Sequence, residues 1–289
     1  MKKYLILGAT GLLGSRLLRE FADSHGTRYR NSLSFNNNLH YLEGGDADSF
    51  DTLLKKIRPD VVINCIGLAN VDRCDTLPEK SWQINYSLPV KFAEVCKSNS
   101  IKFIQISTDH YLNFGAQKLT EVDKVWPVNQ YGFSKLLAEK LVLLVNSNSI
   151  VVRTNFFHFN AKHPKTFLDK LLWSNSEQKI INSFGDVIFT PVSTNYLSLC
   201  IQRLVDLNYS GVINISCNEA MSKYEFHEAV LKILKINSAF HSPIDVGESG
   251  LTAQRPKYMA LDNSLLKSVT AYHIPSIYDM INLELELSI

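Results

Sequence analysis

The chain has little glycine and proline, with 13 and 9 of these residues among 289. This scarcity excludes a collagen-like or low-complexity chain, because both classes are rich in these two residues. Neither sign of charge dominates: 30 Lys and Arg residues stand against 28 Asp and Glu residues, and the formal net charge is +2. No run of Lys and Arg is long enough to form a basic stripe, so we expect no nucleic-acid partner.

Long apolar runs are also missing. No segment approaches the roughly 20 apolar residues that are needed to cross a bilayer. The basic N-terminal segment is followed by only four apolar residues, Tyr4–Leu7, before Gly8, and the apolar part of a signal peptide is longer, at about 7–15 residues. We therefore expect no membrane association and a cytoplasmic location.

Cysteine is sparse, and its spacing along the chain suggests no disulfide or metal-binding pairs. The five cysteines are odd in number and show no C-x-x-C spacing, which excludes a disulfide framework and a zinc site of the usual kinds. We predict no metal site, and we interpret the cysteines as small buried side chains in a reducing compartment. They are Cys65, Cys74, Cys96, Cys200 and Cys217.

What the sequence does contain is an alternation of short apolar runs with helical patterns. A chain of this length can bury about three-quarters of its unfolded surface. Alternating strands and helices are typical of βαβ units around a parallel sheet. We therefore predict a doubly wound α/β (Rossmann) fold, with strands at Tyr4–Leu7, Val61–Ile66, Ile101–Ile106 and Ser149–Arg153 and helices at Leu12–Ala22, Ser81–Lys97 and Tyr131–Val145.

The alternation weakens after about residue 156, which predicts a second part of the chain. We assign residues 1–156 plus about 187–216 to the Rossmann domain, and about 157–186 and 217–289 to a smaller C-terminal lobe that binds substrate. Within this lobe Ser222 followed by Glu225 has the pattern of a capping box and predicts the start of a helix.

A glycine-rich turn follows the first predicted strand and opens the first predicted helix. Gly8, Gly11 and Gly14 give the spacing G-x-x-G-x-x-G, in which glycine lets the chain turn sharply and lets backbone N–H groups approach a pyrophosphate. The positive end of the helix dipole favours the same phosphates. An ordinary strand-to-helix turn is the alternative, but the position of these glycines favours a dinucleotide cofactor.

The choice of cofactor depends on the segment after the second strand. An acidic residue that would bind a ribose 2′-hydroxyl is absent from Thr27–Ser32, which contains two arginines instead. Arg30 would accommodate a 2′-phosphate, which points to NADPH, with NADH as the alternative. A solvated loop arginine explains the same residue equally well.

Tyr131 and Lys135 lie four residues apart at the start of a predicted helix, and hence on one face. The reference pKa of a phenol is near 10, too high for efficient proton transfer at neutral pH, and a nearby ammonium lowers it. Such a pair suits the reduction of a carbonyl group. Thr108 follows a predicted strand at the sheet edge where ligands bind in open α/β folds, and its hydroxyl would orient the carbonyl.

Together these motifs resemble the extended short-chain dehydrogenases/reductases, and among them the dTDP-4-dehydrorhamnose reductase family. The resemblance extends over essentially the whole chain, and its most diagnostic segments are Arg255-Pro256 and Leu261-Asp262. The matching segments also include Gly8–Gly14, Asn64–Gly67, Ile84–Pro89, Ser107–Asp109, Tyr131–Lys135, Arg153-Thr154 and Thr190–Thr194.

The resemblance implies a role for each matched residue. Thr108, Tyr131 and Lys135 would be the catalytic residues, and Lys135 would also hold the nicotinamide ribose. Asp46 resembles the aspartate beside the adenine, although a helix N-cap explains it as well. The implied cofactor contacts are Gly8, Thr10, Gly11, Leu12, Leu13, Gly14, Arg30, Asp46, Ala47, Cys65, Ile66, Gly67, Asn85, Ser107, Tyr131 and Lys135, and the implied substrate contacts are Thr108, Asp109, His110, Phe156 and Arg255.

The sequence departs from the family pattern at two places that should border the sugar. His110 begins a segment with one apparent insertion, and Phe156 stands where the family often has Trp. His110 is interpreted as a substrate contact, a second proton donor or a packed side chain. Arg255 has the planar guanidinium that suits the diphosphate of a nucleotide sugar.

We predict that the chain reduces a 4-keto-6-deoxy nucleotide sugar for surface polysaccharide synthesis, and a homodimer is its candidate assembly. One alternative is a regulatory subunit, because Met221–Glu225 and Gln254–Pro256 are similar to segments of the β subunit of methionine adenosyltransferase. The other is a nucleotide-sugar epimerase or dehydratase, which would retain its nicotinamide through the catalytic cycle.

Overall fold

The computed structural model describes residues 2–28, 38–42, 46–112, 117–159 and 167–287. The chain divides into two compact units. The first unit comprises Met1–Thr108, Asn129–Arg153 and Ile201–Ile213, and the second comprises Asp109–Val128, Thr154–Cys200 and Asn214–Ile289. Among the described residues, no helix is long and apolar enough to span a membrane.

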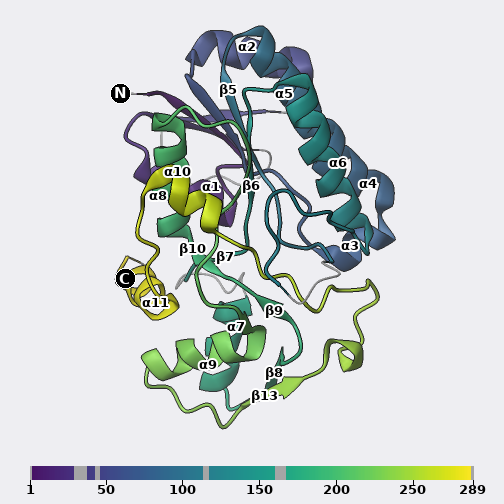
Figure 1. Ribbon diagram of the computed structural model, residues 1–289, viewed down its shortest axis with the longest axis vertical. Helices are drawn as coiled ribbons and strands as arrows, with labels where there is room; N and C mark the ends of the chain where they lie inside the picture. The colour runs from purple at the N-terminus through teal and green to yellow at the C-terminus, as the bar shows by residue number, and fades with distance from the viewer. Residues whose placement is uncertain (1, 29–37, 43–45, 113–116, 160–166, 288–289) are drawn as a thin grey trace. The chain divides into compact units, whose positions relative to one another are not determined.

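The first unit is built on a seven-stranded sheet in the order β11-β6-β5-β4-β1-β2-β3 (Figure 1). Neighbouring strands from β3 to β6 run parallel, so the predicted doubly wound fold is confirmed. The strand order reverses between β1 and β4, and ligands of such sheets bind at the carboxyl ends of strands beside this point. The strands are β1 (Tyr4–Leu7), β2 (Ser24–Arg28), β3 (Leu39–Tyr41), β4 (Val61–Asn64), β5 (Lys102–Ile106), β6 (Ile150–Arg153) and β11 (Gly211–Asn214).

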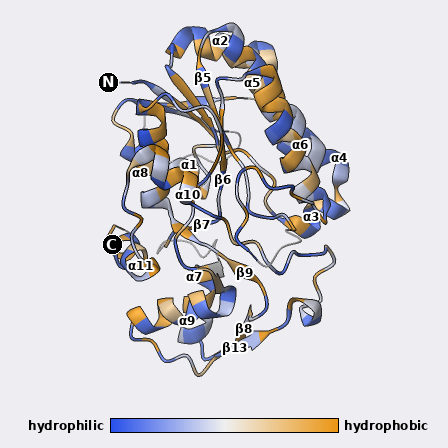
Figure 2. Ribbon diagram, in the orientation of Figure 1, coloured by the Kyte–Doolittle hydropathy of each residue, from blue (hydrophilic) through white to orange (hydrophobic). Residues whose placement is uncertain are grey.

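Helices α2 (Ala47–Ile57), α5 (Leu88–Ser98) and α6 (Gln130–Val145) cover one face of this sheet. Phe50 and Phe92 bury their rings there, 4.5 Å apart. Alternate residues of β1 point to the opposite face of the sheet. There Tyr4 packs on Phe21, which directly follows α1 (Leu12–Glu20). Both faces are thus covered, which explains why the central strands are apolar throughout, as the orange colour in Figure 2 shows.

The predicted helix Ser81–Lys97 is three elements in the structure. After α3 (Val71–Thr76), helix α4 (Pro78–Trp82) passes through a π-helical turn, Gln83–Ser87, into α5. Pro89 has no N–H, so it cannot donate to the carbonyl of Asn85 four residues earlier, and the N–H of Leu88 bonds instead to the carbonyl of Gln83, five residues back. The wider turn places the Asn85 side chain inside the fold, where it is fully buried.

The second unit contains short strands that form three two-stranded sheets, β7 with β10, β9 with β12 and β8 with β13. Such short pairs show no long alternating pattern, which is why the sequence pattern loosens here. The elements are β7 (Phe156–Phe157), α7 (Phe167–Ser176), β8 (Ile181–Phe184), β9 (Ile188–Phe189), β10 (Val192–Ser193), α8 (Thr194–Asp206), β12 (Met221–Ser222), α9 (Lys223–Ile233), β13 (His241–Ile244), a 3₁₀ turn (Val246–Glu248), α10 (Ser264–Thr270) and α11 (Ile277–Glu286).

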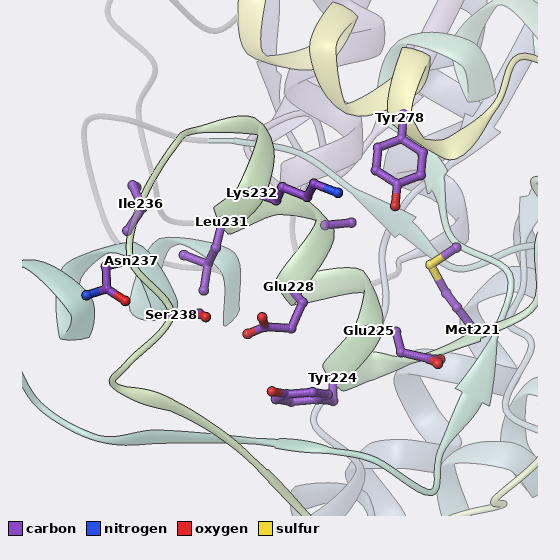
Figure 3. Close-up of a pocket in the computed structure, with 11 residues that line it drawn as sticks. Met221, Tyr224, Glu225, Glu228, Leu231, Lys232, Ile236, Asn237, Ser238 and Tyr278 are labelled. Carbon is purple, nitrogen blue, oxygen red and sulfur yellow. The ribbon is translucent and has the colours of Figure 1, made fainter.

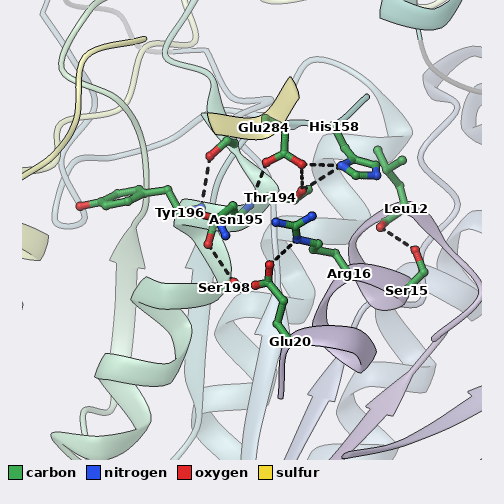
Figure 4. Close-up of polar contacts among 11 residues, drawn as sticks. Leu12, Ser15, Arg16, Glu20, His158, Thr194, Asn195, Tyr196, Ser198 and Glu284 are labelled. Carbon is green, nitrogen blue, oxygen red and sulfur yellow. Dashed lines mark hydrogen bonds and ion pairs between the residues drawn. The ribbon is translucent and has the colours of Figure 1, made fainter. Parts of the chain in front are cut away.

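A buried carboxylate ties α11 to the start of α8 (Figure 4). Glu284 is fully buried and contacts His158 Nδ1 at 2.5 Å and Thr194 Oγ1 at 2.9 Å. Its second oxygen accepts from the backbone N–H of Asn195 at 3.1 Å, so it also caps the N-terminus of α8. Since a carboxylate only accepts hydrogen bonds, we assign the proton between His158 and Glu284 to Nδ1.

Helix α9 begins at the predicted capping box. Ser222 Oγ accepts from the backbone N–H of Glu225 at 3.0 Å, and the Glu225 carboxylate accepts from the backbone N–H of Ser222 at 2.7 Å. The prediction of this helix start is confirmed.

Candidate active site

The glycine turn joins β1 to α1 with a backbone that side chains would obstruct. Gly8 has a φ of +76°, which favours glycine, and a Cβ on Gly14 would lie 2.3 Å from the carbonyl oxygen of Gly8. The N–H of Gly8 donates to Thr27 Oγ1 at 3.1 Å, which ties the turn to β2. Among the described residues no side chain caps α1 at its N-cap, Gly11. The helix N-terminus is therefore open to an anionic group.

The other residues of the turn differ in exposure. Leu13 is buried and contributes to the core, while Thr10 and Leu12 are half-buried. Leu13 could therefore offer a cofactor only its backbone, whereas the side chains of Thr10 and Leu12 are partly accessible.

A second loop, Cys65–Gly67, leaves the neighbouring strand β4. Asn64 holds its start, because Asn64 Oδ1 accepts from the N–H of Ile66 at 3.1 Å. Asn85 holds its end by two hydrogen bonds to the backbone of Leu68, at 2.8 Å from the N–H and 3.1 Å to the carbonyl. Burial raises the pKa of the Cys65 thiol to about 12, so this cysteine is not a nucleophile at neutral pH.

Lys135 lies one helical turn after Tyr131 in α6, and its side chain is buried. Its ammonium donates to the carbonyl of Ile106, the last residue of β5, at 2.6 Å. Asn129 caps the helix by accepting from the N–H of Gly132 at 2.8 Å, which fixes the first turn that carries Tyr131. Thr108, two residues beyond β5, is also buried. All three predicted catalytic residues thus belong to the first unit.

An ion pair that the sequence did not predict joins α6 to the end of β6. Glu139 accepts from Ser107 Oγ at 2.5 Å and from Arg153 Nε and Nη2 at 3.0 and 2.8 Å. All three side chains are buried. The pair connects the ends of β5 and β6 to α6. The signal that could have revealed it was Glu139, an acidic residue one turn after Lys135 on the same helix.

Burial lowers the pKa of Lys135 to about 8, although the Glu139 carboxylate opposes the shift. Between pH 8 and the ordinary lysine pKa near 10.5, the unfolded chain binds a proton that the folded chain has released. The free energy of unfolding therefore rises with pH in this window. We expect Lys135→Met to remove this rise, because methionine does not titrate.

The measurement is urea unfolding of both proteins from pH 7 to 10.5. The unmodified protein should gain stability relative to Lys135→Met as the pH increases. A constant difference between the two curves would show that the Lys135 ammonium keeps its ordinary pKa.

Thr108 belongs to the first unit, and the other four predicted substrate contacts belong to the second. They are Asp109, His110, Phe156 and Arg255. Asp109 is buried and accepts from Asn155 Nδ2 at 2.8 Å. Burial, reinforced by the charges of Lys223 and Arg255, lowers the pKa of His110 to about 3, so His110 is neutral at neutral pH. Phe156 is half-buried in β7, and Arg255 Nη1 donates to the carbonyl of Ala253 at 2.5 Å.

Two further predicted cofactor contacts are Arg30 and Asp46. Arg30 lies outside the described residues. Asp46 is the N-cap of α2, where its carboxylate accepts from the N–H groups of Asp48 and Ser49 at 3.3 and 3.0 Å. The N-cap interpretation of Asp46 is thus correct, and Ala47 is the first residue of that helix.

One hollow, of about 660 Å³, lies along α9 in the second unit (Figure 3). Tyr224 and Glu228 of α9 and Tyr278 of α11 are among its lining side chains. None of the predicted site residues lines it. Among the described residues, no group of three or more His, Cys, Asp or Glu side chains is placed to hold a metal ion.

Beside this hollow, Ser183, His241 and Glu228 form a chain of the residue types found in hydrolase triads. His241 Nε2 lies 2.7 Å from Ser183 Oγ, and His241 Nδ1 lies 2.6 Å from the Glu228 carboxylate. However, the same hydroxyl lies 2.7 Å from His227 Nδ1, and the Ser183 residue is only 2% exposed. A nucleophile must reach a substrate, so we interpret the chain as a packing network.

The model of the RmlD substrate binding domain family matches residues 1–285. The chain belongs to this family. The family resemblance inferred from the sequence is therefore confirmed.

Known proteins of similar sequence include a probable low-salt glycan biosynthesis reductase of Haloferax volcanii, 25% identical over 95% of this chain and 94% of the relative. The β subunit of methionine adenosyltransferase 2 of Rattus norvegicus is 27% identical over 93% of this chain and 82% of its own length. Among solved structures, a dTDP-4-dehydrorhamnose reductase of Bacillus anthracis in complex with NADP superimposes with a TM-score of 0.87 at 21% identity, covering 99% of both chains.

Proposed function

We propose that this chain reduces the carbonyl group of a 4-keto-6-deoxy nucleotide sugar, with NADPH as the hydride donor. The observation that carries the proposal is the anchoring of Lys135 to the end of β5, one helical turn from Tyr131. The names of the relatives support a role in glycan or polysaccharide synthesis, since they include the Haloferax volcanii reductase and a spore coat polysaccharide biosynthesis protein of Bacillus subtilis.

The first unit fits a dinucleotide cofactor. The glycine turn and the Cys65–Gly67 loop leave β1 and β4, the two strands between which the sheet order reverses. Gly14 lets the start of α1 approach Gly8 closely, and the open N-terminus of α1 suits a pyrophosphate. The Asn85-supported loop and the Lys135 ammonium would hold the nicotinamide ribose.

We assign the catalytic roles to three side chains. A bound reduced nicotinamide supplies the hydride that adds to the carbonyl carbon. Tyr131 donates its phenolic proton to the carbonyl oxygen, and the Lys135 ammonium stabilises the phenolate that remains. Thr108 donates a hydrogen bond that orients the same oxygen. The product is the alcohol, and the Tyr131 proton is then restored from solvent.

Residues of the second unit bind the substrate in this proposal. Arg255 has the fork of N–H donors that suits a diphosphate. Neutral His110 is unsuited to protonate the substrate at neutral pH, so it acts as a hydrogen-bonding contact to the sugar. Phe156, in place of the more usual tryptophan, offers a smaller apolar surface.

The test is NADPH oxidation with a panel of dTDP-, UDP- and GDP-linked 4-keto-6-deoxy sugars. We expect at least one of them to be reduced. The result that would overturn the proposal is no reduction of any sugar together with a co-purifying partner enzyme whose activity this chain changes. That outcome would favour a regulatory role like that of the methionine adenosyltransferase subunit. Formation of a 4-keto or epimerised product without net cofactor turnover would instead favour an epimerase or dehydratase.

A separate expectation concerns cofactor choice. Arg28 ends β2, Arg30 follows two residues later, and Thr27–Ser32 contains no carboxylate. The chain should therefore bind NADPH more tightly than NADH, and Arg30→Ala should erase most of the difference. A charge-assisted contact to the 2′-phosphate contributes on the order of 1.5–3 kcal/mol. Fluorescence titration of both reduced cofactors gives the two affinities. Equal affinities in the unmodified protein would rule out this role for Arg30.

A further inference from the structure

Two amide side chains are buried in the centre of the parallel sheet, where most residues are apolar. Asn64, the last residue of β4, and Gln105 of β5 are each 1% exposed and stand opposite each other in the pairing of the two strands. They share a face of the sheet with Val62 and Phe103, which belong to the core under α5 and α6. Buried amides need hydrogen-bond partners, so their contacts indicate what they hold in place.

The hydrogen bonds of the two amides form one chain that leads from the loop after β4 to α6. Asn64 Oδ1 accepts from the N–H of Ile66 at 3.1 Å, and Asn64 Nδ2 donates to Gln105 Oε1 at 2.8 Å. Gln105 Nε2 donates in turn to the carbonyl of Ile106 at 2.8 Å. The same carbonyl accepts from the Lys135 ammonium at 2.6 Å. The chain therefore joins a loop, a strand and a helix.

Chemistry fixes the direction of every bond in this chain. A backbone N–H only donates, so the oxygen of Asn64 must face Ile66 and its NH₂ group must face Gln105. Gln105 then presents its oxygen to Asn64 and its NH₂ group to the Ile106 carbonyl, which only accepts. Turning either amide over would place two donors or two acceptors against each other. A chain that is satisfied in one arrangement fixes the positions of its two ends.

Stability alone does not require two amides at these positions. A buried hydrogen-bonded pair can be replaced by apolar side chains of the same shape at little cost in stability. Apolar side chains could not, however, hold the Ile66 N–H and the carbonyl that anchors Lys135 in a fixed relation. These two ends are the parts of the first unit that would hold the nicotinamide ribose.

We propose that Gln105 is a positioning residue that couples the Cys65–Gly67 loop to Lys135, so that both contact the cofactor as one rigid unit. This inference rests on the proposed function, because it takes the loop and the ammonium as the groups that bind the nicotinamide ribose. Gln105 does not contact the cofactor itself. It acts through Asn64 on one side and through the Ile106 carbonyl on the other.

The first measurement is the affinity for NADP⁺ by calorimetric titration. Gln105→Met, which has a similar volume and no amide, should weaken binding about three- to tenfold, as expected for the loss of one or two neutral hydrogen bonds. The loss should be smaller when Asn64→Leu or Lys135→Met is already present, because either change interrupts the chain. Packing alone predicts the same loss in all three backgrounds. That result would overturn the inference, as would an unchanged affinity of Gln105→Met.

Asn146→Leu is the matched control for these buried changes. Asn146 is another buried amide of the first unit, but it caps the C-terminus of α6 and donates to the carbonyl of Ala93 at 3.3 Å. Its replacement should leave the affinity for NADP⁺ within twofold. If Asn146→Leu weakens binding as much as Gln105→Met, a general loosening of the first unit explains both variants and the inference fails.

Amide hydrogen exchange of the cofactor-free protein tests the chain without any ligand. The Ile66 N–H should exchange about tenfold faster in Gln105→Met, because its acceptor Asn64 has lost the partner that fixes it. Asn146→Leu should leave this rate unchanged. If the unmodified protein binds no NADP⁺, the proposed function fails, and the positioning role fails with it. If the protein binds NADP⁺ and Gln105→Met leaves the Ile66 exchange rate unchanged, only the inference about Gln105 is overturned.

Discussion

Tyr131→Phe should lower kcat by about 10²–10⁴-fold, the usual contribution of a positioned general acid. Phenylalanine keeps the ring and removes only the hydroxyl, so the first turn of α6 and its Asn129 cap should be unchanged. The cofactor affinity should stay within about twofold, because Lys135 keeps its bond to Ile106. Single-turnover reduction and a cofactor titration measure the two quantities.

A matched comparison at Lys135 strengthens this experiment. Lys135→Met should reduce both kcat and cofactor affinity, because in the proposed function one ammonium serves the phenol and the nicotinamide ribose. We therefore expect Tyr131→Phe to lower kcat alone, and Lys135→Met to lower both kcat and cofactor affinity. Full activity of the Tyr131→Phe protein would show that another group donates the proton.

Arg153→Met should lower the free energy of unfolding by about 3–5 kcal/mol, the usual result of removing one partner of a buried ion pair. Glu139 is 2% exposed and would keep its negative charge after losing the guanidinium that pairs with it. Urea unfolding at pH 7 measures the loss. The methionine side chain fills similar space, so a cavity does not explain the effect.

The double variant Glu139→Gln with Arg153→Met is the control. It removes both charges and leaves an amide oxygen that can accept from Ser107. We expect it to be clearly more stable than Arg153→Met alone, because the cost of the single change is an uncompensated charge. If the double variant is no more stable, the loss comes from packing and not from electrostatics.

Local signals in the sequence were sufficient for the centre of the first unit. The glycine turn and the Tyr131–Lys135 pair depend on neighbours within a few residues, and so does the capping box at Ser222. Helix boundaries were less certain. The predicted helix Ser81–Lys97 missed the π-helical turn, although Pro89 supplied its physical cause.

Other features depend on contacts between distant segments. Asn85 supports Leu68 through a fold that brings residues 17 positions apart together. Glu139 of α6 contacts Ser107, which follows β5, and Arg153, which ends β6.

The sequence by itself determined the fold class and the family, because the alternation of strands and helices and the matching segments extend along the whole chain. It also predicted the glycine turn and the Tyr131–Lys135 pair, because each depends on residue spacing within a few positions. Only the tertiary structure decided that Asp46 is a helix cap and that His110 is neutral at neutral pH. Burial and the charges of distant residues set these properties. Neither quantity is encoded in local sequence.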